Sequence, residues 1–550
     1  MKHKIASLIV LGIVTCSLTA CQNILSMFGI GGGNGGYSYR SIIPDVPTPR
    51  PGSTKAYASS LTYEDYAQNN LYPLSVTPST GEAKLLVIPV WFNDSNSVIA
   101  NDKKDLVRSD IQAAYFGSNE ETGWRSVKTY YEEESHGALT LTGTVSDWYD
   151  ARVSYMAYAD DPEQHNTMQL VADATNWYFT NNSDNRNDYD CDNDGYMDGV
   201  MLIYAAPDYD VLKNNNATNL WAYCYWIQND NTIRNNNTNP RVNAFFWASH
   251  DFMYGQEQLK NRTGYSTYKN GDTSVVNIDT HTYIHEMGHM FGLSDYYDYS
   301  AHQYKPAAGF SMQDNNVGGH DPFSSFALGW GKAYVPNEST IINLKKFATT
   351  GEMIVLTPQW NGHNSAFDEY LIIEYYDTDG LNGLDTTHHY MSASGKGYPK
   401  GSQEKGIRLW HVDARLLYST SKNFSPSRIS TTTDNGLGNK VTLLNSNTYV
   451  DGNKIKSDSD YVSPLARTDS KYASYNLLQM IHNNKNATHE SRASLNNSDP
   501  LFKADDVFSM SEYGKQFVNQ GKFNSDKELG FTFKVNALNK NYASITITKL

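Results

Sequence analysis

The chain has 550 residues, with 44 basic and 59 acidic side chains and a formal net charge of −15. This excess of acid argues against a nucleic acid as the main partner, because nucleic-acid binding depends on basic side chains that neutralise phosphates. Hydrophobic residues make up 39% of the chain and aromatic residues 13%, which is enough to bury a core in two to four domains and excludes wholesale disorder.

The N-terminus has the pattern of a secretion signal. Polar residues at positions 2–4 precede an apolar stretch at residues 5–18, and small residues then lead into Cys21 in a pattern that resembles the lipobox of bacterial lipoproteins. We therefore expect residues 1–21 to be a signal peptide whose Cys21 carries lipid and becomes the mature N-terminus. An uncleaved anchor helix is the alternative, although the apolar stretch is short for a bilayer span. Either way, the body of the protein is expected outside the cytoplasm, anchored to the bacterial cell surface.

Residues 22–80 follow this signal and differ from the rest of the chain in composition. A glycine-rich run at residues 29–36 and a proline-rich run at residues 44–51 cannot pack a core. This segment is expected to be a tether that holds the globular part off the membrane. A cleavable pro-segment is the alternative, and the sequence leaves both open.

Strands and helices alternate in the next part of the chain, up to about residue 206. Continuous apolar runs predict buried strands, and apolar residues at helical spacing predict amphipathic helices. The expected order is a strand at residues 84–92 (KLLVIPVWF), a helix at 126–136 capped by Ser126 and ended by Gly137, a strand at 139–145, a helix at 168–179 and a strand at 200–205. This alternation indicates a first domain with one main sheet.

From about residue 335 the pattern changes to short extended runs separated by polar, glycine-containing loops. The runs that we expect to be strands include residues 353–356, 369–375, 407–412 and 543–548. No repeat of fixed period is present, which argues against solenoids and propellers. This half of the chain is therefore expected to be β-rich.

The sharpest chemical signal is HEMGHMFGLSD at residues 285–295, which follows a plausible helical lead-in at residues 280–284. His285 and His289 lie four residues apart, so on a helix both imidazoles can face one ion. Catalytic zinc usually takes three protein ligands and keeps one open position. Gly292 can end the helix in a left-handed turn that returns the chain, which makes Asp295 the third ligand. An ordinary amphipathic helix with unrelated histidines is the alternative.

Glu286 directly follows the first histidine, and its position predicts the role of general base. Zinc acts as a Lewis acid and activates water, and Glu286 can take the proton and hand it to the departing amine. Hydrolysis of peptide bonds in protein or peptide substrates is the reaction that this combination suits best.

A second acidic cluster occupies residues 188–198. Its alternating carboxylates and the turn at Gly195 are typical of a calcium loop. The expected ligands are Asp190, Asp192, Asp194, the Tyr196 carbonyl and Asp198. Met201 stands where an EF-hand has glutamate, so the motif is incomplete. A solvated loop of Asx turns is the alternative, and a bound calcium ion would stabilise the loop without taking part in bond cleavage.

Two cysteines, Cys191 and Cys224, remain in the folded body once Cys16 is removed with the signal and Cys21 carries lipid. An oxidising exterior favours a disulfide between them, and two free thiols are the equal alternative.

Several separated segments resemble the immune inhibitor A family of bacterial zinc metallopeptidases, which are relatives of the metzincins. The segments are LLVIPVWFNDS at residues 85–95, SVKTYYEEESHGALTLTGTV at 126–145, GLSDYYDY at 292–299, FSMQDNNVGGHDPFSSFALGW at 310–330, EYLIIEYY at 369–376 and GIRLWHVD at 406–413. The resemblance therefore covers about residues 85–415 and is weaker beyond them.

This resemblance implies an α+β fold. A metzincin-like zinc metallopeptidase domain with a mixed sheet and a zinc-binding helix would occupy residues 81–335, and a β-rich C-terminal region would occupy residues 336–550. It also implies zinc on the two histidines and Asp295, catalysis by Glu286, and Met312 as a packing floor beneath the site.

One position departs from the pattern of many metzincins, which place a tyrosine two residues after the methionine to stabilise the transition state. Here that residue is Asp314, so no such residue is assigned. His320 could reach the substrate, although helix capping or packing is the more ordinary role for it.

Two classes of function remain open on the sequence alone. The first is an extracytoplasmic, lipid-anchored zinc endopeptidase, and the second is a surface adhesin or glycan-binding lipoprotein with a structural or inactive metal site. Glu286 favours the enzyme, because a structural zinc site needs no base beside a ligand and usually has four closed ligands. A different zinc hydrolase is a third option.

Overall fold

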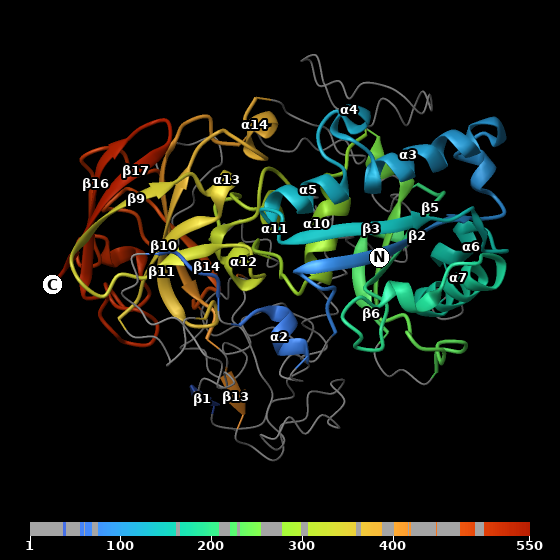
Figure 1. Ribbon diagram of the computed structural model, residues 1–550, viewed down its shortest axis with the longest axis horizontal. Helices are drawn as coiled ribbons and strands as arrows, with labels where there is room; N and C mark the ends of the chain where they lie inside the picture. Colours follow the sequence, from blue (N-terminus) through green and yellow to red (C-terminus); the bar gives the residue numbers. More distant parts are fainter. Residues whose placement is uncertain are drawn as a thin grey trace, which may run out of the picture.

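The structure is a computed structural model, shown as a ribbon in Figure 1. It describes residues 37–39, 55–59, 61–68, 75–160, 166–207, 220–227, 232–254, 278–298, 306–358, 365–387, 401–415, 417–419, 447, 474–489 and 500–550. The signal peptide, Cys21, and the glycine-rich and proline-rich runs expected between residues 1 and 51 lie outside the described residues. Within these ranges, no helix combines the length and the apolar character that a bilayer crossing requires.

The first sheet is mixed, as predicted. Its strand order is β3 (Leu139–Val145), β2 (Gly81–Trp91), β5 (Gly199–Tyr204), β7 (Ala244–Ser249) and β6 (Tyr223–Trp226), and β4 (Tyr149–Asp150) pairs with the end of β2. All pairs are parallel except the one between β6 and β7. The three strands expected from the sequence are therefore β2 and β5, from apolar runs, and β3, from alternation of apolar and polar residues, whereas β6 and β7 were not predicted.

Helices cover both faces of this sheet. Leu85 and Val87 of β2 belong to one apolar cluster with α3 (Lys104–Phe116), α5 (Val127–Glu134) and α10 (His281–Met290). Leu86 and Ile88 face the other way and belong to a second cluster with α7 (Thr167–Asn181). Because side chains alternate along a strand, a strand buried on both faces reads as one continuous apolar run.

The predicted capping of α5 is confirmed. Ser126 accepts a hydrogen bond from the backbone N–H of Thr129 and forms a capping box with it, and Gly137 has a φ of 76° in the left-handed region. Further short helices are α2 (Tyr63–Gln68), α4 (Asn119–Thr122), α6 (Tyr155–Asp160), α11 (Met312–Asn315), α12 (Pro322–Ala327), α13 (Phe347–Thr350) and α14 (Asn382–Asp385).

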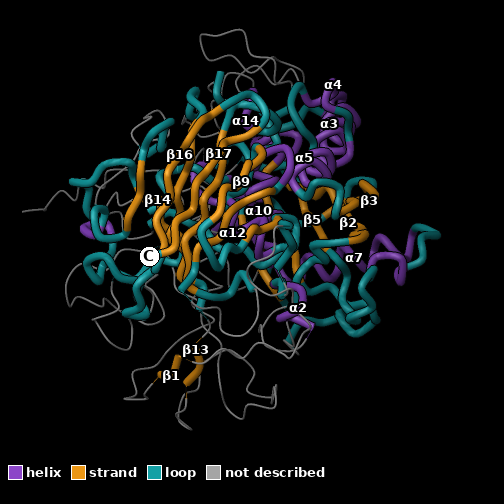
Figure 2. The backbone as a smooth tube through the Cα atoms, turned by 60° about the vertical axis from the view of Figure 1, so that its left-hand side comes forward, coloured by secondary structure: helices purple, strands orange, loops and turns teal. Residues whose placement is uncertain are grey.

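Two further sheets lie in the C-terminal part of the chain. The five-stranded sheet has the order β14 (Leu478–Ile481), β12 (Gly406–Asp413), β11 (Glu369–Tyr376), β10 (Glu352–Leu356) and β8 (Lys332–Tyr334). The four-stranded sheet has the order β15 (Val507–Ser509), β16 (Phe531–Leu538), β17 (Tyr542–Lys549) and β9 (Thr340–Lys345), and a small pair joins β1 (Tyr37–Tyr39) to β13 (Leu417–Ser419). In Figure 2, β16, β17 and β9 run side by side. Apolar side chains of the five-stranded and the four-stranded sheets, such as Ile373 and Phe533, belong to one apolar cluster.

The zinc-motif helix lies at the junction of these parts. In Figure 1, α10, α11 and α12 lie between the first sheet and the sheet that contains β10 and β11. One apolar cluster joins Met287 of α10 to Phe326 of α12, Tyr370 of β11 and Trp410 of β12. Residues from both sides of position 335 therefore pack into a common core around the site.

The described part of the 22–80 segment is packed against this body. Tyr63 is buried, the N–H of Thr77 donates to the Met290 carbonyl at 2.9 Å, and Trp330 Nε1 donates to the Ser79 carbonyl at 2.6 Å. Cys191 and Cys224 are both free thiols in the structure, so the disulfide alternative is not formed.

Candidate metal centre and active site

The local fold of residues 285–295 brings the three expected ligands together. His285 and His289 lie one turn apart on α10, and their rings are 4.9 Å apart. Gly292 then has a φ of 102°, as expected for a left-handed turn after the helix, and the chain returns to place Asp295 beside both histidines. A side chain at position 292 would also meet the Tyr63 ring at 3.0 Å, so both the backbone conformation and the space require glycine.

The ligand atoms converge on one point. His285 Nε2 lies 2.9 Å and His289 Nε2 lies 3.4 Å from Asp295 Oδ1, and the ligand atoms of the three residues all lie within 4.8 Å of one another. All three residues are buried. This donor set of two imidazoles and one carboxylate suits a tetrahedral zinc site with one open position.

Hydrogen bonds to backbone carbonyls orient both imidazoles. His285 Nδ1 lies 2.8 Å from the Met312 carbonyl oxygen, and His289 Nδ1 lies 2.8 Å from that of Leu293. Because each Nδ1 donates to a carbonyl, each Nε2 is left unprotonated and faces Asp295, as a metal ligand must. The Met312 side chain is fully buried, and the contact that the structure shows between this residue and the site is made by its backbone carbonyl.

The polar atoms of this site fit a bound cation. His285 Nε2 is buried and makes no hydrogen bond within the described part of the chain. A buried polar atom without a hydrogen-bond partner lowers the stability of the fold, so its presence here indicates a binding site for a ligand such as a metal ion. Burial alone would raise the pKa of Asp295, but its interactions with His289 and His285 outweigh burial and hold that pKa well below its usual range. Asp295 therefore stays ionised, which metal binding requires.

Glu286 is fully buried beside the ligands. Burial raises the pKa of its carboxyl to about 7, although the neighbouring His289 and His285 oppose this increase. A proton acceptor works best when its pKa lies near the working pH, so this position suits a group that takes up and releases a proton near neutrality.

His320 and Asp314 have structural surroundings. The His320 ring stacks on Tyr131 at 5.8 Å and packs against Trp330 at 6.2 Å, and burial lowers the pKa of His320 to about 3, so its ring is neutral. The N-cap of α12 is Asp321, which accepts from the Ser324 N–H at 2.9 Å. The structure thus favours packing over capping for His320. Asp314 accepts from the Gly309 N–H at 2.7 Å and holds its own loop.

A buried charged cluster that the sequence did not predict anchors the first turn of α10. His281 Nδ1 donates to Asp279 at 2.7 Å and His281 Nε2 donates to Asp385 at 3.1 Å, while the ring stacks on Trp124 at 4.1 Å with an interplanar angle of 3°. Burial alone would lower the pKa of His281, but Asp385 and Asp279 outweigh it and raise this pKa to about 10. Asp385 comes from α14, 104 residues further along the chain, so no local pattern could have indicated the pair.

We expect Asp385→Asn to lower the free energy of unfolding by roughly 2–4 kcal/mol, because a buried imidazolium loses one of its two carboxylates. The folded pKa of His281, about 10, exceeds its ordinary value of 6.5. The stabilisation is therefore complete below pH 6.5 and is lost as the pH rises towards 10. Urea unfolding at pH 6 and pH 9 measures both effects, with Asp379→Asn on the exposed end of the same loop as the matched control. Equal stability of Asp385→Asn and wild type at pH 6 would contradict this assignment.

The acidic loop partly matches the predicted calcium site. Carboxylate oxygens of Asp190, Asp192 and Asp194 lie within 4.8 Å of one another, and Gly195 has a φ of 90°. Asp198 is outside this group, because its carboxylate accepts from the N–H groups of Lys84 at 2.7 Å and Cys191 at 2.9 Å. The carboxylates within the loop accept from backbone N–H groups of residues 194–196, as the Asx-turn alternative predicts.

Comparison with known families identifies the first domain as a metallopeptidase. Residues 78–315 match the family model of the immune inhibitor A peptidase M6 catalytic domain, a range that contains the whole first sheet, α10, the three expected ligands and Met312. Residues 78–315 are therefore a catalytic domain of the immune inhibitor A peptidases, a zinc-dependent family, and the resemblance found in the sequence is confirmed over this range. No curated protein matches the chain.

Proposed function

We propose that this protein is a zinc endopeptidase that hydrolyses peptide bonds within protein substrates, with Glu286 as its general base. The observation that carries the proposal is the arrangement at α10. Two oriented imidazoles and an ionised carboxylate converge within 4.8 Å, and the carboxylate of the residue next to His285 is buried beside them. A structural metal site would not need this additional carboxylate.

Each residue has a distinct part in the proposed reaction. A zinc ion held by His285, His289 and Asp295 would supply a Lewis acid that activates water and polarises the scissile carbonyl. Glu286 takes the proton from the attacking water on a carboxylate oxygen and delivers it to the departing amide nitrogen. The carbonyls of Met312 and Leu293 keep both imidazoles in the orientation that binding requires.

Digestion of casein before and after treatment with phenanthroline tests this function, with zinc content measured on the same samples. We expect proteolysis to disappear as zinc is removed and to return when one equivalent of zinc is added, because metal binding by deprotonated ligands is reversible. Proteolysis that persists after complete zinc removal would contradict the proposal.

We also propose that the enzyme acts outside the cytoplasm while a lipid on Cys21 holds it to the membrane. The support is the sequence before Cys21, with its short apolar stretch and small residues. Fractionation of cells that express the wild type or Cys21→Ser tests this proposal. The wild type is expected with the membranes and the variant is not, whereas the same distribution for both would contradict it.

We propose finally that Asp190, Asp192 and Asp194 bind a structural calcium ion. These carboxylates repel one another, and burial together with Asp192 raises the pKa of Asp194 to about 7, so a cation would relieve the repulsion. An increase in melting temperature on addition of calcium, absent in Asp192→Asn, is the expected result. An unchanged melting temperature would leave the Asx-turn loop as the explanation.

A further inference from the structure

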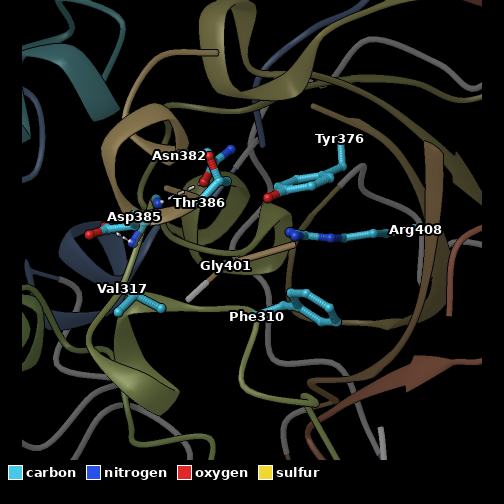
Figure 3. Close-up of a pocket in the computed structure, with 10 residues that line it drawn as sticks. Phe310, Val317, Tyr376, Asn382, Asp385, Thr386, Gly401 and Arg408 are labelled. Carbon is cyan, nitrogen blue, oxygen red and sulfur yellow. Dashed lines mark hydrogen bonds between the residues drawn. The ribbon is translucent and has the colours of Figure 1, made fainter. Parts of the chain in front are cut away.

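A cavity lies beside the candidate metal site, and its lining residues have no part in the proposed mechanism. It is formed where the loop after α11 meets α14 and the strands β11 and β12. Figure 3 shows its lining side chains. Gly319 and Asn382 are half-buried, whereas the rest of the lining is buried. The cavity is therefore a small pocket with a restricted opening.

One wall of this pocket is shared with the metal site. The segment at residues 312–319, which contains α11, begins with Met312, whose carbonyl orients His285, and ends with Gly318 and Gly319, which line the pocket. A hydrogen bond of 3.1 Å from the Met312 N–H to the Gly319 carbonyl closes this loop. A molecule in the pocket would thus lie close to the reaction centre.

The unusual group in the pocket is Arg408. Its side chain is only 7% exposed, and its guanidinium lies between two rings, 3.4 Å from the centre of Tyr376 and 4.1 Å from that of Phe310. In Figure 3 the guanidinium points between these rings towards Asp385 and Thr386. Arg408 Nε is buried and makes no hydrogen bond within the described residues. Such an arginine is a fixed cation with unused donors.

The acidic groups near Arg408 do not use these donors. Glu374 Oε1 forms an ion pair with Arg408 Nη1 at 3.6 Å, a separation beyond hydrogen-bonding distance. Its partner oxygen, Glu374 Oε2, accepts from Trp410 Nε1 at 2.9 Å. Asp385 is already bound to His281 and to the Gly318 N–H. Among the described residues, the pocket is therefore lined by a buried cation whose Nε donor makes no hydrogen bond.

We infer that this pocket binds a carboxylate of the peptide substrate through the Arg408 guanidinium. The planar donors of arginine match the two oxygens of a carboxylate, and the two flanking rings hold the guanidinium in place before the substrate arrives. The inference rests on the proposed peptidase function and names the class of substrate that it favours. The carboxylate belongs either to an acidic side chain or to the C-terminus of the peptide.

Two pairs of synthetic peptides, based on a sequence that the wild-type enzyme cleaves, test the inference and distinguish the two sources. In the first comparison all peptides are amidated at the C-terminus. At each position around the cleaved bond in turn, a peptide with glutamate is compared with the same peptide with glutamine. The second pair has a free or an amidated C-terminus and no acidic side chain. We expect kcat/KM to be at least about tenfold higher for the carboxylate member of one pair, because a charge-assisted contact is lost in the amide.

Arg408→Gln is expected to reduce that preference to about twofold or less. The ratio of the two rates is measured within one variant, so a loss of folded enzyme lowers both rates and leaves the ratio unchanged. Lys534→Gln is the matched control, because Lys534 is a half-exposed cation on β16, in the four-stranded sheet and outside the pocket. It should keep the wild-type preference.

The outcomes separate this inference from the proposed function. Cleavage of both members of each pair at equal rates by the wild type would overturn the inference and leave the peptidase function intact. A preference that survives in Arg408→Gln would also overturn it, because Arg408 would then have a structural role only. Absence of cleavage of every peptide and of casein would instead contradict the proposed function.

Discussion

Glu286→Gln is expected to lower kcat for peptide hydrolysis by about 10²- to 10⁴-fold, the usual contribution of a positioned acid–base group. Glutamine has nearly the same size as glutamate but cannot accept the proton of the attacking water. Glu286 is fully buried and has a pKa of about 7, so the structure offers this carboxylate for proton transfer near neutral pH. Casein digestion and single-peptide kinetics measure the loss.

Zinc content separates this effect from damage to the site. Glu286 is not one of the three converging ligands, so Glu286→Gln should retain about one equivalent of zinc. Glu120→Gln, the same chemical change on the exposed α4, should retain both zinc and wild-type activity. Normal turnover in Glu286→Gln would show that another group is the base.

Asp295→Ala is expected to abolish activity by a different route, through loss of the metal. The variant retains two imidazoles but loses the anionic ligand, and we expect zinc affinity to fall by more than about 100-fold, the upper range for residues that merely support a ligand. The low pKa of Asp295 means that the wild-type ligand is ionised throughout the neutral range. Elemental analysis after dialysis, together with competition against a chelator of known affinity, measures the change.

Asp147→Ala is the matched control for this variant. Asp147 is 86% exposed and pairs with Arg108 at 3.3 Å, and an exposed ion pair contributes little to stability. This control should therefore bind zinc and cleave casein as the wild type does. An Asp295→Ala protein that still holds one zinc equivalent after dialysis would show that the third ligand lies elsewhere.

Local sequence determined the central features of this protein because their geometry depends on spacing within a few residues. Four residues from His285 to His289 make one helical turn, Gly292 supplies a left-handed exit from it, and Asp295 follows within the same bend. The apolar run at residues 84–92 predicted β2 because a strand covered on both faces is apolar at every position. Ser126 likewise predicted the start of α5, since capping involves only the next three residues.

Only the tertiary structure decided the features whose partners are far apart in the chain. The strands β6 and β7 are short and follow long polar stretches of sequence, so their pairing depends on the sheet that they join. Asp385 reaches His281 across 104 residues, and Arg408 acquires its two flanking rings from β11 and from the loop before α11. The role of Asp198 also depended on a distant segment. Its spacing in the sequence fits a calcium loop, but its carboxylate accepts a hydrogen bond from the backbone N–H of Lys84. Spacing fixes neighbours along one helix or turn, whereas contacts between distant segments arise only when the whole chain packs.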